Sequence, residues 1–600
     1  MASSRRRLSI ATLLQVLSVS FSALAPGQPR VLYTLAMSKP STHLFEVSMK
    51  VESLPPQQTL DFLLPVWRPG MYRVLDLAGG IQEFAAYDGD DRPLRWQKID
   101  KSDWRVEANG TSVVIIRYKV YANEFYQRTR GLNDEHGFVD GTAVFMYLES
   151  CRNTPLMLEV QPFHGWHVTT GLDGAGNRFH APSYDYFVDC PLEVGTQRDF
   201  EFTVDRVPHV LSISSEGNWT ADTLIRDISK IVKAQKDFWG EFPYKRYVFL
   251  VECLPNPTGA TEHMNSTIIH TSPFIFKNPD WYRNFLGNVS HEYFHTWNVK
   301  QLRPKGMDPY KFQSENYSNE LWVAEGTTSY YGNLFMERLG FVKPDKFVSD
   351  IAGAVQTDRQ QPGNSVQPPS DASFDSWVKG SRGQESAYNF ESDIYQRGAN
   401  VSGILDLQIR KMSGNKHSLD DVMKEMYKRF PLTGSGYTLK DLQSVSEEFS
   451  GSSLSSFFDA YVWGARPLPW EESLLTAGIE LTPKDSVRKP WVGISSYDSG
   501  DRTIVRFVVA GSPAENAGIQ VGDELLALND RRIRSAGFGD RVGEMNIGDS
   551  FSLTVFRNDK LRTASVKVGT APVPVYTSSK VTNPTPGQRS VYESWLLVPW

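Results

Sequence analysis

The chain has 600 residues, which is too long for one hydrophobic core and indicates roughly three to five domains. Its composition is that of an ordinary globular protein, with 40% hydrophobic residues, 22% charged residues and a formal charge of −6. This weakly acidic balance gives no electrostatic reason to expect nucleic acid, so no nucleic acid is expected as a partner.

The first 25 residues have the layout of an export signal. Three arginines at 5–7 precede an apolar stretch at 8–25 that carries no charge and ends in small residues. This order is typical of secretory signals, so we expect an exported protein, either periplasmic or secreted. Because Pro26 follows the obvious cleavage point, the stretch is alternatively a membrane anchor. No other segment approaches the roughly 18 apolar residues needed to span a bilayer.

Residues 30–207 predict an N-terminal all-β domain. Short runs in which hydrophobic and polar residues alternate, such as 45–51 and 112–118, are separated by turn residues. A period of two is typical of strands with one buried face. Cys151 and Cys190 lie in this domain, and the sequence fits either a disulfide between them or buried thiols.

The middle of the chain predicts a mixed domain followed by a helical one. In residues 208–345, helical patterns cover 220–238 and 281–298, the latter with Asp280 as N-cap, and 247–251 predicts a buried strand. Residues 346–485 predict an α-helical domain after a loop at 360–383 that is rich in Pro, Ser, Gly and Gln. Its helical segments are 400–412, 419–428, 439–449 and 454–462.

The last part of the chain changes character near Pro490. Short β runs between 487 and 570 surround a segment rich in Gly and Ala at 510–523, which predicts a separate small module. Residues 571–600 contain many Pro and Ser residues and predict a poorly ordered tail, although 592–600 is unexpectedly apolar.

A metal-binding motif, His291-Glu292-Tyr293-Phe294-His295, lies in the predicted helix 281–298. Histidines four residues apart lie on one helical face and can bind one metal ion, while the glutamate between them can take a proton from a water molecule at the metal. Zinc binds neutral imidazoles, keeps one position open and lowers the pKa of water there to about 7. The motif therefore predicts a zinc-dependent hydrolase; two structural histidines on an amphipathic helix are the alternative.

Three downstream acids compete to be the third zinc ligand: Glu315, Glu320 and Glu325. Spacing slightly favours Glu315, but its surroundings at 313–318 are polar and have no helical face. Glu320 is expected in a first helical turn, where acids favour the helix dipole. Glu325 lies in a largely apolar predicted helix at 321–340, where a buried acid needs a partner such as zinc. We therefore predict Glu325.

Together, these two helices resemble those of the gluzincin peptidases, and nearly the whole chain resembles the glycyl aminopeptidase family with a C-terminal PDZ domain, a relative of the aminopeptidase N type. The resemblance implies a multidomain α+β fold: a β domain, a thermolysin-like zinc peptidase domain at 208–345, an α-helical domain and a PDZ domain. It also implies Zn²⁺ as cofactor and peptides with a free N-terminus as substrates, with Gly or Ala as the residue removed.

The segment from Gly259 to His263 resembles the Gly-Gly-x-Glu-His strand that these aminopeptidases lay beside the substrate. The resemblance implies that Glu262 binds the free α-amine, because a carboxylate at a closed end of the cleft selects chains by their N-terminus. Ala260 replaces the second glycine of the family and leaves less room for the backbone to approach. An ordinary acid on a surface strand is the alternative for Glu262.

A second segment, Tyr395-Gln396-Arg397-Gly398-Ala399, resembles the Tyr-x-Lys-Gly-Ala run of the family, with arginine in place of lysine. The resemblance implies that its tyrosine donates a hydrogen bond to the oxyanion of the tetrahedral intermediate. Tyr388 is the rival for this role, and a packing tyrosine is the alternative for both.

The small module at 487–570 resembles the PDZ domain of exported proteases. Its carboxylate-binding loop would be Trp491-Val492-Gly493-Ile494, whose backbone N–H groups can hold the C-terminus of a peptide that adds a strand. The resemblance leaves open whether this groove binds substrate, a partner or nothing.

Two other functions fit the same residues. A zinc endopeptidase would have a cleft that Glu262 does not close, and a PDZ-bearing binding protein would carry a vestigial metal site. All the expected catalytic residues are present, which argues against the vestigial metal site. The sequence does not determine the oligomeric state.

Overall fold

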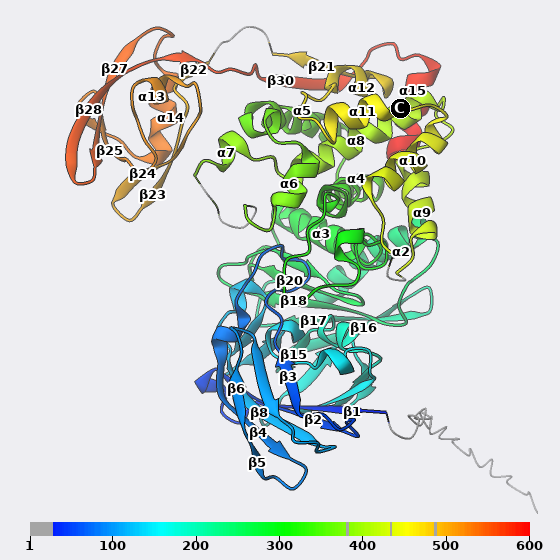
Figure 1. Ribbon diagram of the computed structural model, residues 1–600. Helices are drawn as coiled ribbons and strands as arrows, with labels where there is room; N and C mark the ends of the chain where they lie inside the picture. The colour runs from blue at the N-terminus through cyan, green and yellow to red at the C-terminus, as the bar shows by residue number, and fades with distance from the viewer. Residues whose placement is uncertain (1–27, 380–382, 384, 433–434, 485–488) are drawn as a thin grey trace, which may run out of the picture.

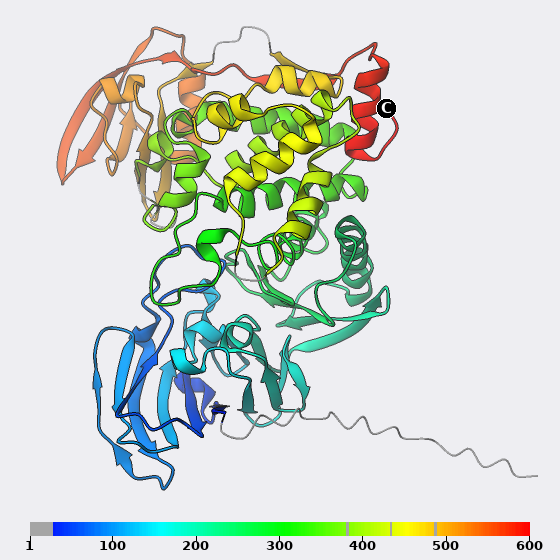
Figure 2. The ribbon, with the colours of Figure 1, turned by 45° about the vertical axis from the view of Figure 1, so that its right-hand side comes forward.

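A computed structural model describes residues 28–379, 383, 385–432, 435–484 and 489–600. The predicted signal or anchor at 1–25 and the predicted domain junction at 485–487 lie outside the described residues. Among the described residues, no helix is long and apolar enough to cross a membrane. Figures 1 and 2 show sheets of the N-terminal half at one end, helices in the middle and a small β module beside the helices.

The N-terminal domain is built mainly from antiparallel sheets. Alternate side chains of its long strands face the core, as the alternating sequence pattern predicts. Its eight-stranded sheet has the spatial order β13 (Asp173–Ala175), β14 (Arg178–Ala181), β11 (Leu156–Gln161), β1 (Arg30–Ala36), β2 (Leu44–Glu52), β8 (Val114–Tyr121), β4 (Ile81–Asp88), β5 (Pro93–Leu94). A three-stranded sheet contains β3 (Thr59–Leu63), β7 (Asp103–Glu107) and β6 (Trp96–Lys98). A four-stranded sheet contains β12 (His167–Thr170), β15 (Leu192–Gly195), β10 (His136–Val139) and β9 (Arg130–Leu132).

The three cysteines of the chain are thiols. Cys151, Cys190 and Cys253 are all free and buried, so the considered disulfide is wrong and the buried-thiol alternative holds.

The next domain has a five-stranded sheet covered by helices. Its order is β16 (Arg198–Val204), β17 (Val207–Ser214), β18 (Tyr247–Cys253), β20 (Ser266–Thr271), β19 (Ala260–Glu262), with a parallel centre and antiparallel edges. Its helices are α2 (Ala221–Trp239), α3 (Pro279–Phe294) and α4 (Thr328–Arg338). β16 pairs along its whole length with β17, so this sheet takes strands from both sides of the predicted boundary at 207. The predicted cap Asp280 is also wrong: Asn278 accepts the hydrogen bonds at the start of α3.

Above this sheet lies the predicted α-helical domain (Figure 1). Part of the predicted loop at 360–383 is helical, because Pro369 starts a short helix there. The helices are α5 (Pro344–Gln360), α6 (Pro369–Asp375), α7 (Ala387–Phe390), α8 (Gln396–Met412), α9 (Leu419–Arg429), α10 (Leu439–Ser450), α11 (Ser455–Tyr461) and α12 (Trp470–Thr476).

The small C-terminal module has a hydrophobic core of its own, as a separate domain requires. Its elements are β22 (Pro490–Trp491), β23 (Ile494–Ser499), β24 (Arg502–Val508), α13 (Pro513–Asn516), β25 (Glu524–Leu528), β26 (Arg531–Arg532), α14 (Ser535–Gly543), β27 (Ser550–Arg557), β28 (Lys560–Lys567) and β29 (Gly569–Thr570).

The prediction of a poorly ordered tail at 571–600 is wrong. β30 (Tyr576–Lys580) returns from the small module and pairs with β21 (Ile479–Pro483) of the helical domain. α15 (Pro586–Leu596) follows, and Figure 1 shows it beside the helical domain. Trp595 Nε1 donates to the hydroxyl of Tyr330 on α4 at 2.8 Å. Burial of apolar side chains on α15 explains the hydrophobic end of the sequence.

Candidate metal centre

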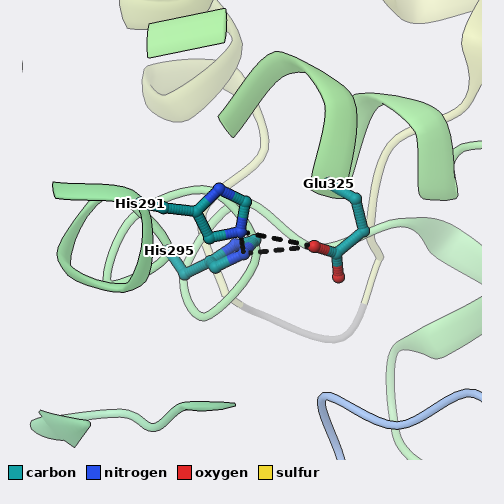
Figure 3. A group of neighbouring side chains, drawn as sticks. All are labelled: His291, His295 and Glu325. Carbon is teal, nitrogen blue, oxygen red and sulfur yellow. Dashed lines mark hydrogen bonds and ion pairs between the residues drawn. The ribbon is translucent and has the colours of Figure 1, made fainter. Parts of the chain in front are cut away.

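Two histidines and a glutamate meet between two helices. His291 lies in the last turn of α3 and His295 directly follows this helix, so both rings lie on the same side. Glu325 lies in η7 (Trp322–Thr327), a π-helical turn that leads into α4. Figure 3 shows both rings directed at the carboxylate. From Glu325 Oε2, His295 Nε2 lies 3.3 Å away and His291 Nε2 3.7 Å away.

These three side chains, which we name the metal centre, fit a divalent metal ion. Their ligand atoms all lie within 4.8 Å of one another. Two imidazole nitrogens and one carboxylate oxygen form a common donor set of catalytic zinc sites, which leave a fourth position open. Glu325 is 3% exposed, and a carboxylate so deeply buried requires a positive partner.

The electrostatics of the metal centre also favour a cation. Burial raises the pKa of Glu325, but interactions with His295 and His291 outweigh this effect and hold the pKa below its ordinary value. Burial lowers the pKa of His295, yet Glu325 outweighs it and raises that pKa to about 9. Burial keeps the pKa of His291 below its ordinary value. The proton on His295 therefore neutralises the Glu325 carboxylate in the place where a metal ion would do so.

Neighbouring groups orient the ligands. His295 Nδ1 donates to the backbone carbonyl of Asn298 at 2.7 Å, which leaves Nε2 free to bind a metal. The hydroxyl of Tyr72, from the N-terminal domain, donates to Glu325 Oε1 and so fixes this carboxylate. The side chain of Ser329 lies 3.3 Å from His291 Nδ1. Each predicted ligand therefore has a partner that holds its orientation.

The rival acids lie elsewhere. Glu320 is buried, and its carboxylate accepts hydrogen bonds from the Ser318 hydroxyl at 2.6 Å and the Leu439 backbone N–H at 3.1 Å. Glu315 is half-buried in a segment without helix or strand. The structure thus brings Glu325, and neither rival, to the two histidines.

Glu292 lies beside the metal centre as a candidate general base. Its side chain is buried, and among the described residues its Oε2 atom has no hydrogen-bond partner. Burial raises its pKa to about 8, and the nearby carboxylates of Glu262 and Glu325 act in the same direction. A carboxylate with a pKa near neutrality can both accept and return a proton.

Glu262 ends the edge strand β19 and faces the same space. Ligand atoms of Glu262, Glu292 and His295 lie within 4.8 Å of one another. On the other side, the N-terminal domain approaches at Gly70, where a Cβ atom would lie only 2.7 Å from Glu262 Oε2. Gly70 also has a φ of +78°, so this position requires glycine in two ways. The N-terminal domain therefore borders Glu262 directly.

The other residues of the predicted substrate strand have different positions. Gly259 is exposed and Ala260 is half-buried at the edge of the sheet, where the backbone of a peptide can pair. The side chain of His263 is buried instead and lies 3.2 Å from Asp189, which also binds Lys300 at 2.9 Å. The structure therefore brings the backbone of this strand, but not the His263 ring, to an open edge.

Tyr395 precedes α8 and lies over the metal centre. It is 42% exposed, and its ring stacks at 6.4 Å from the ring of His291. Although the side chain as a whole is exposed, desolvation around its hydroxyl and then the carboxylates of Glu325, Glu262 and Glu292 raise its pKa above the ordinary value, so the phenol remains a donor.

The rival Tyr388 lies away from the metal centre. Its ring stacks on Phe507 of the small module at 4.3 Å, and its hydroxyl donates to the Gln360 carbonyl at 2.9 Å. Arg397, which replaces the lysine of the family, is buried in an ion pair with Asp358 at 2.7 Å.

Sequence reasoning missed the contribution of the N-terminal domain. Besides Tyr72, two arginines reach the site, and burial lowers the pKa of both while Glu262 and Glu292 attract them. Arg68 is fully buried, and Arg128 donates to the Thr261 hydroxyl at 2.9 Å. The motif Trp67-Arg68-Pro69-Gly70 carried a weak signal, because charge and glycine rarely interrupt a buried segment.

Comparison with known proteins agrees with this arrangement. The profile of the M61 peptidase N-terminal domain matches residues 32–196, that of the M61 glycyl aminopeptidase matches 284–401, and that of a PDZ domain matches 478–568. No curated protein matches the chain.

Solved structures include similar chains. An aminopeptidase N family protein from Idiomarina loihiensis is 25% identical, with a TM-score of 0.87, over 94% of this chain and 100% of that chain. An M1 zinc metallopeptidase from Deinococcus radiodurans is 14% identical, with a TM-score of 0.45, over 74% of this chain and 96% of that chain.

The three profile matches follow one another in the predicted order, and the Idiomarina structure shares the fold over nearly the full length. The multidomain α+β fold is thereby confirmed. The chain carries the N-terminal and catalytic domains of the M61 glycyl aminopeptidases followed by a PDZ domain, and it is a metallo-aminopeptidase.

Proposed function

We propose that the protein releases small N-terminal residues, Gly or Ala, from peptides, with Zn²⁺ held by His291, His295 and Glu325. Zinc, when bound, supplies a Lewis acid that polarises the scissile carbonyl and acidifies water. Glu292 takes the proton of the attacking water and delivers it to the leaving amine. Tyr395 donates its hydroxyl to the developing oxyanion.

The position of Glu262 is the observation that carries the aminopeptidase proposal. Its carboxylate faces the same space as Glu292 and His295, at the end of an edge strand along which a peptide can pair. A carboxylate binds the α-ammonium of a substrate through charge-assisted hydrogen bonds, so that the peptide bond next to the N-terminus is cleaved. For a small first residue the support is the match to the glycyl aminopeptidase profile.

A panel of aminoacyl amides tests this function. We expect the zinc-loaded protein to hydrolyse glycyl and alanyl amides faster than leucyl and phenylalanyl amides, and a chelator to abolish the activity until zinc is restored. Equal rates for all side chains would contradict the size preference. Activity that persists in chelator would contradict the metal mechanism.

We also propose export, for which the basic and apolar pattern of residues 1–25 is the support.

For the PDZ domain we propose capture of a peptide C-terminus at Val492, Gly493 and Ile494. Support comes from the loop geometry: Gly493 has a φ of +82°, and Ile494 starts β23 directly after it. Binding of C-terminal peptides with and without a C-terminal amide would test this, and equal binding would contradict it.

A further inference from the structure

A second group of buried histidines and glutamates lies between the N-terminal domain and the catalytic domain. It consists of His136 on β10, Glu193 on β15, Glu252 on β18 and His270 on β20, and we name it the interface cluster. β10 and β15 are neighbours in the four-stranded sheet of the N-terminal domain. β18 and β20 are neighbours in the five-stranded sheet of the catalytic domain. The interface cluster therefore joins two sheets that belong to different domains.

The surroundings of the interface cluster are apolar. Glu252 and His270 follow hydrophobic residues on the same faces of their strands, since side chains alternate with a period of two. These faces build a small separate core. Its members are Phe138, Val210, Val248, Leu250 and Ile268. In such a place a carboxylate without a compensating charge is strongly destabilising.

Short contacts hold the interface cluster together. His136 Nδ1 lies 2.6 Å from Glu193 Oε1, and His270 Nε2 lies 3.1 Å from Glu252 Oε2. Ligand atoms of His136, Glu193 and Glu252 lie within 4.8 Å of one another. The four side chains are between 0 and 6% exposed. Ligand atoms of a tetrahedral zinc site, each about 2.0–2.2 Å from the ion, are roughly 3.3 Å apart, so only small shifts are needed.

Several polar atoms of the interface cluster lack a hydrogen bond. In the part of the chain that the structure describes, this holds for both carboxylate oxygens of Glu252, for Glu193 Oε2 and for His270 Nε2. His270 Nε2 and Glu252 Oε2 still contact each other at 3.1 Å, but among the described residues Glu252 Oε1 and Glu193 Oε2 have no partner, whereas buried polar atoms nearly always have one. The interface cluster contains two carboxylates, whose charge a divalent cation would neutralise.

We propose that the interface cluster is a second metal site, which binds Zn²⁺ or a similar first-row divalent ion as a structural clip between the two domains. His136, Glu193 and Glu252 supply three ligands, and His270, beside Glu252, supplies the fourth. Imidazole and carboxylate donors suit such ions, and a site closed on all sides by protein is structural rather than catalytic.

The second metal site would also support the substrate strand. The backbone N–H of His270 donates to the carbonyl of Gly259 at 3.0 Å, and His270 Nδ1 lies 3.1 Å from the hydroxyl of Thr258. These contacts hold the start of the strand that ends in Glu262. Fixing His270 to a metal therefore fixes the edge along which a peptide is proposed to pair.

Metal content of the full chain tests this proposal. The protein is loaded with zinc and dialysed, and bound zinc is measured by mass spectrometry. We expect two zinc ions per chain in the wild type and one in the double variant H291A/H295A, which lacks the ligands of the metal centre. Zinc should also raise the Tm of the double variant, because an ion that binds only the folded state stabilises it.

A matched pair of variants locates the remaining ion. In the H291A/H295A background, E252Q should remove the last zinc, whereas E337Q should retain it. Glu337 is a fair control, because it is equally buried and its carboxylate oxygens also lack hydrogen bonds among the described residues. Zinc retained by E252Q would overturn the proposal. A zinc-free H291A/H295A variant would also overturn it, whether or not the E252Q variant folds. The side chains of the interface cluster would then pair only with one another, without a metal ion.

Discussion

The metal centre and the interface cluster are both buried groups of histidine and glutamate, but their surroundings differ. The metal centre stands on helices, and the side chain of His291 remains 18% exposed. A free carboxylate, Glu292, and a phenol, Tyr395, stand beside it. The interface cluster stands on strands, is closed on all sides, and has hydrophobic neighbours. The same ligand types thus suit a catalytic metal site in one place and a structural metal site in the other. Solvent access and the neighbouring side chains make the difference.

The largest effect that separates the two sites is expected from Glu292. The E292Q variant should lose about 10²–10⁴-fold in kcat, because the amide cannot accept the proton of water. Its zinc content should equal that of the wild type, which metal analysis would verify. Wild-type activity in E292Q would remove the functional difference between the two sites.

The second effect concerns the phenol that only the metal centre has. Y395F should lower kcat by about 10²–10³-fold with little change in KM, because the lost hydrogen bond forms mainly in the transition state. Y388F is the matched control and should keep wild-type kcat, since Tyr388 stacks on Phe507 instead. Steady-state kinetics on a glycyl amide measures both. Equal losses in the two variants would argue against an oxyanion role.

Glu262 should affect substrate recognition more than chemistry. E262Q loses a charge-assisted hydrogen bond to the α-amine, worth about 1.5–3 kcal/mol, which corresponds to a fall in kcat/KM of about 10- to 150-fold. The zinc content should not change. If kcat/KM stays the same, the carboxylate does not bind the N-terminus.

The smallest expected effect concerns the orientation of a ligand. Y72F removes the hydrogen bond to Glu325 and should weaken zinc binding at the metal centre by about 10- to 100-fold. Competition with a chelator would measure this, and the interface cluster should keep its ion at the wild-type affinity. An unchanged affinity at the metal centre would show that Tyr72 only packs there.

Local patterns in the sequence predicted the parts of the site that lie on one element. The helix with His291 and His295 has a clear spacing, and an acid inside an apolar helix pointed to Glu325 over Glu315. The groups from the N-terminal domain could not be predicted, because Tyr72 and Glu325 meet only through the packing of two domains. The interface cluster was missed for the same reason: His136 and Glu252 lie on strands far apart in the chain. Its one local signal was an acid, Glu252, inside the buried strand β18.

The end of the chain shows the limit of composition as evidence. Its many Pro and Ser residues predicted a poorly ordered tail, yet Pro586 starts α15 and Thr585 with Gln588 forms a capping box there. The capping signal was present in the sequence. The strand pair that anchors this segment, between β30 and β21, joins residues almost 100 positions apart and leaves no local pattern.

Cleavage of one peptide with a free N-terminal glycine, compared with its N-acetylated twin, tests the central claim most directly. The zinc-loaded protein is incubated with each peptide, and the products are identified by mass spectrometry. Because Glu262 is proposed to bind the α-ammonium, we expect release of glycine from the free peptide and no cleavage of the acetylated one. Cleavage of the acetylated peptide at an internal bond, at a comparable rate, would contradict the account and indicate an endopeptidase.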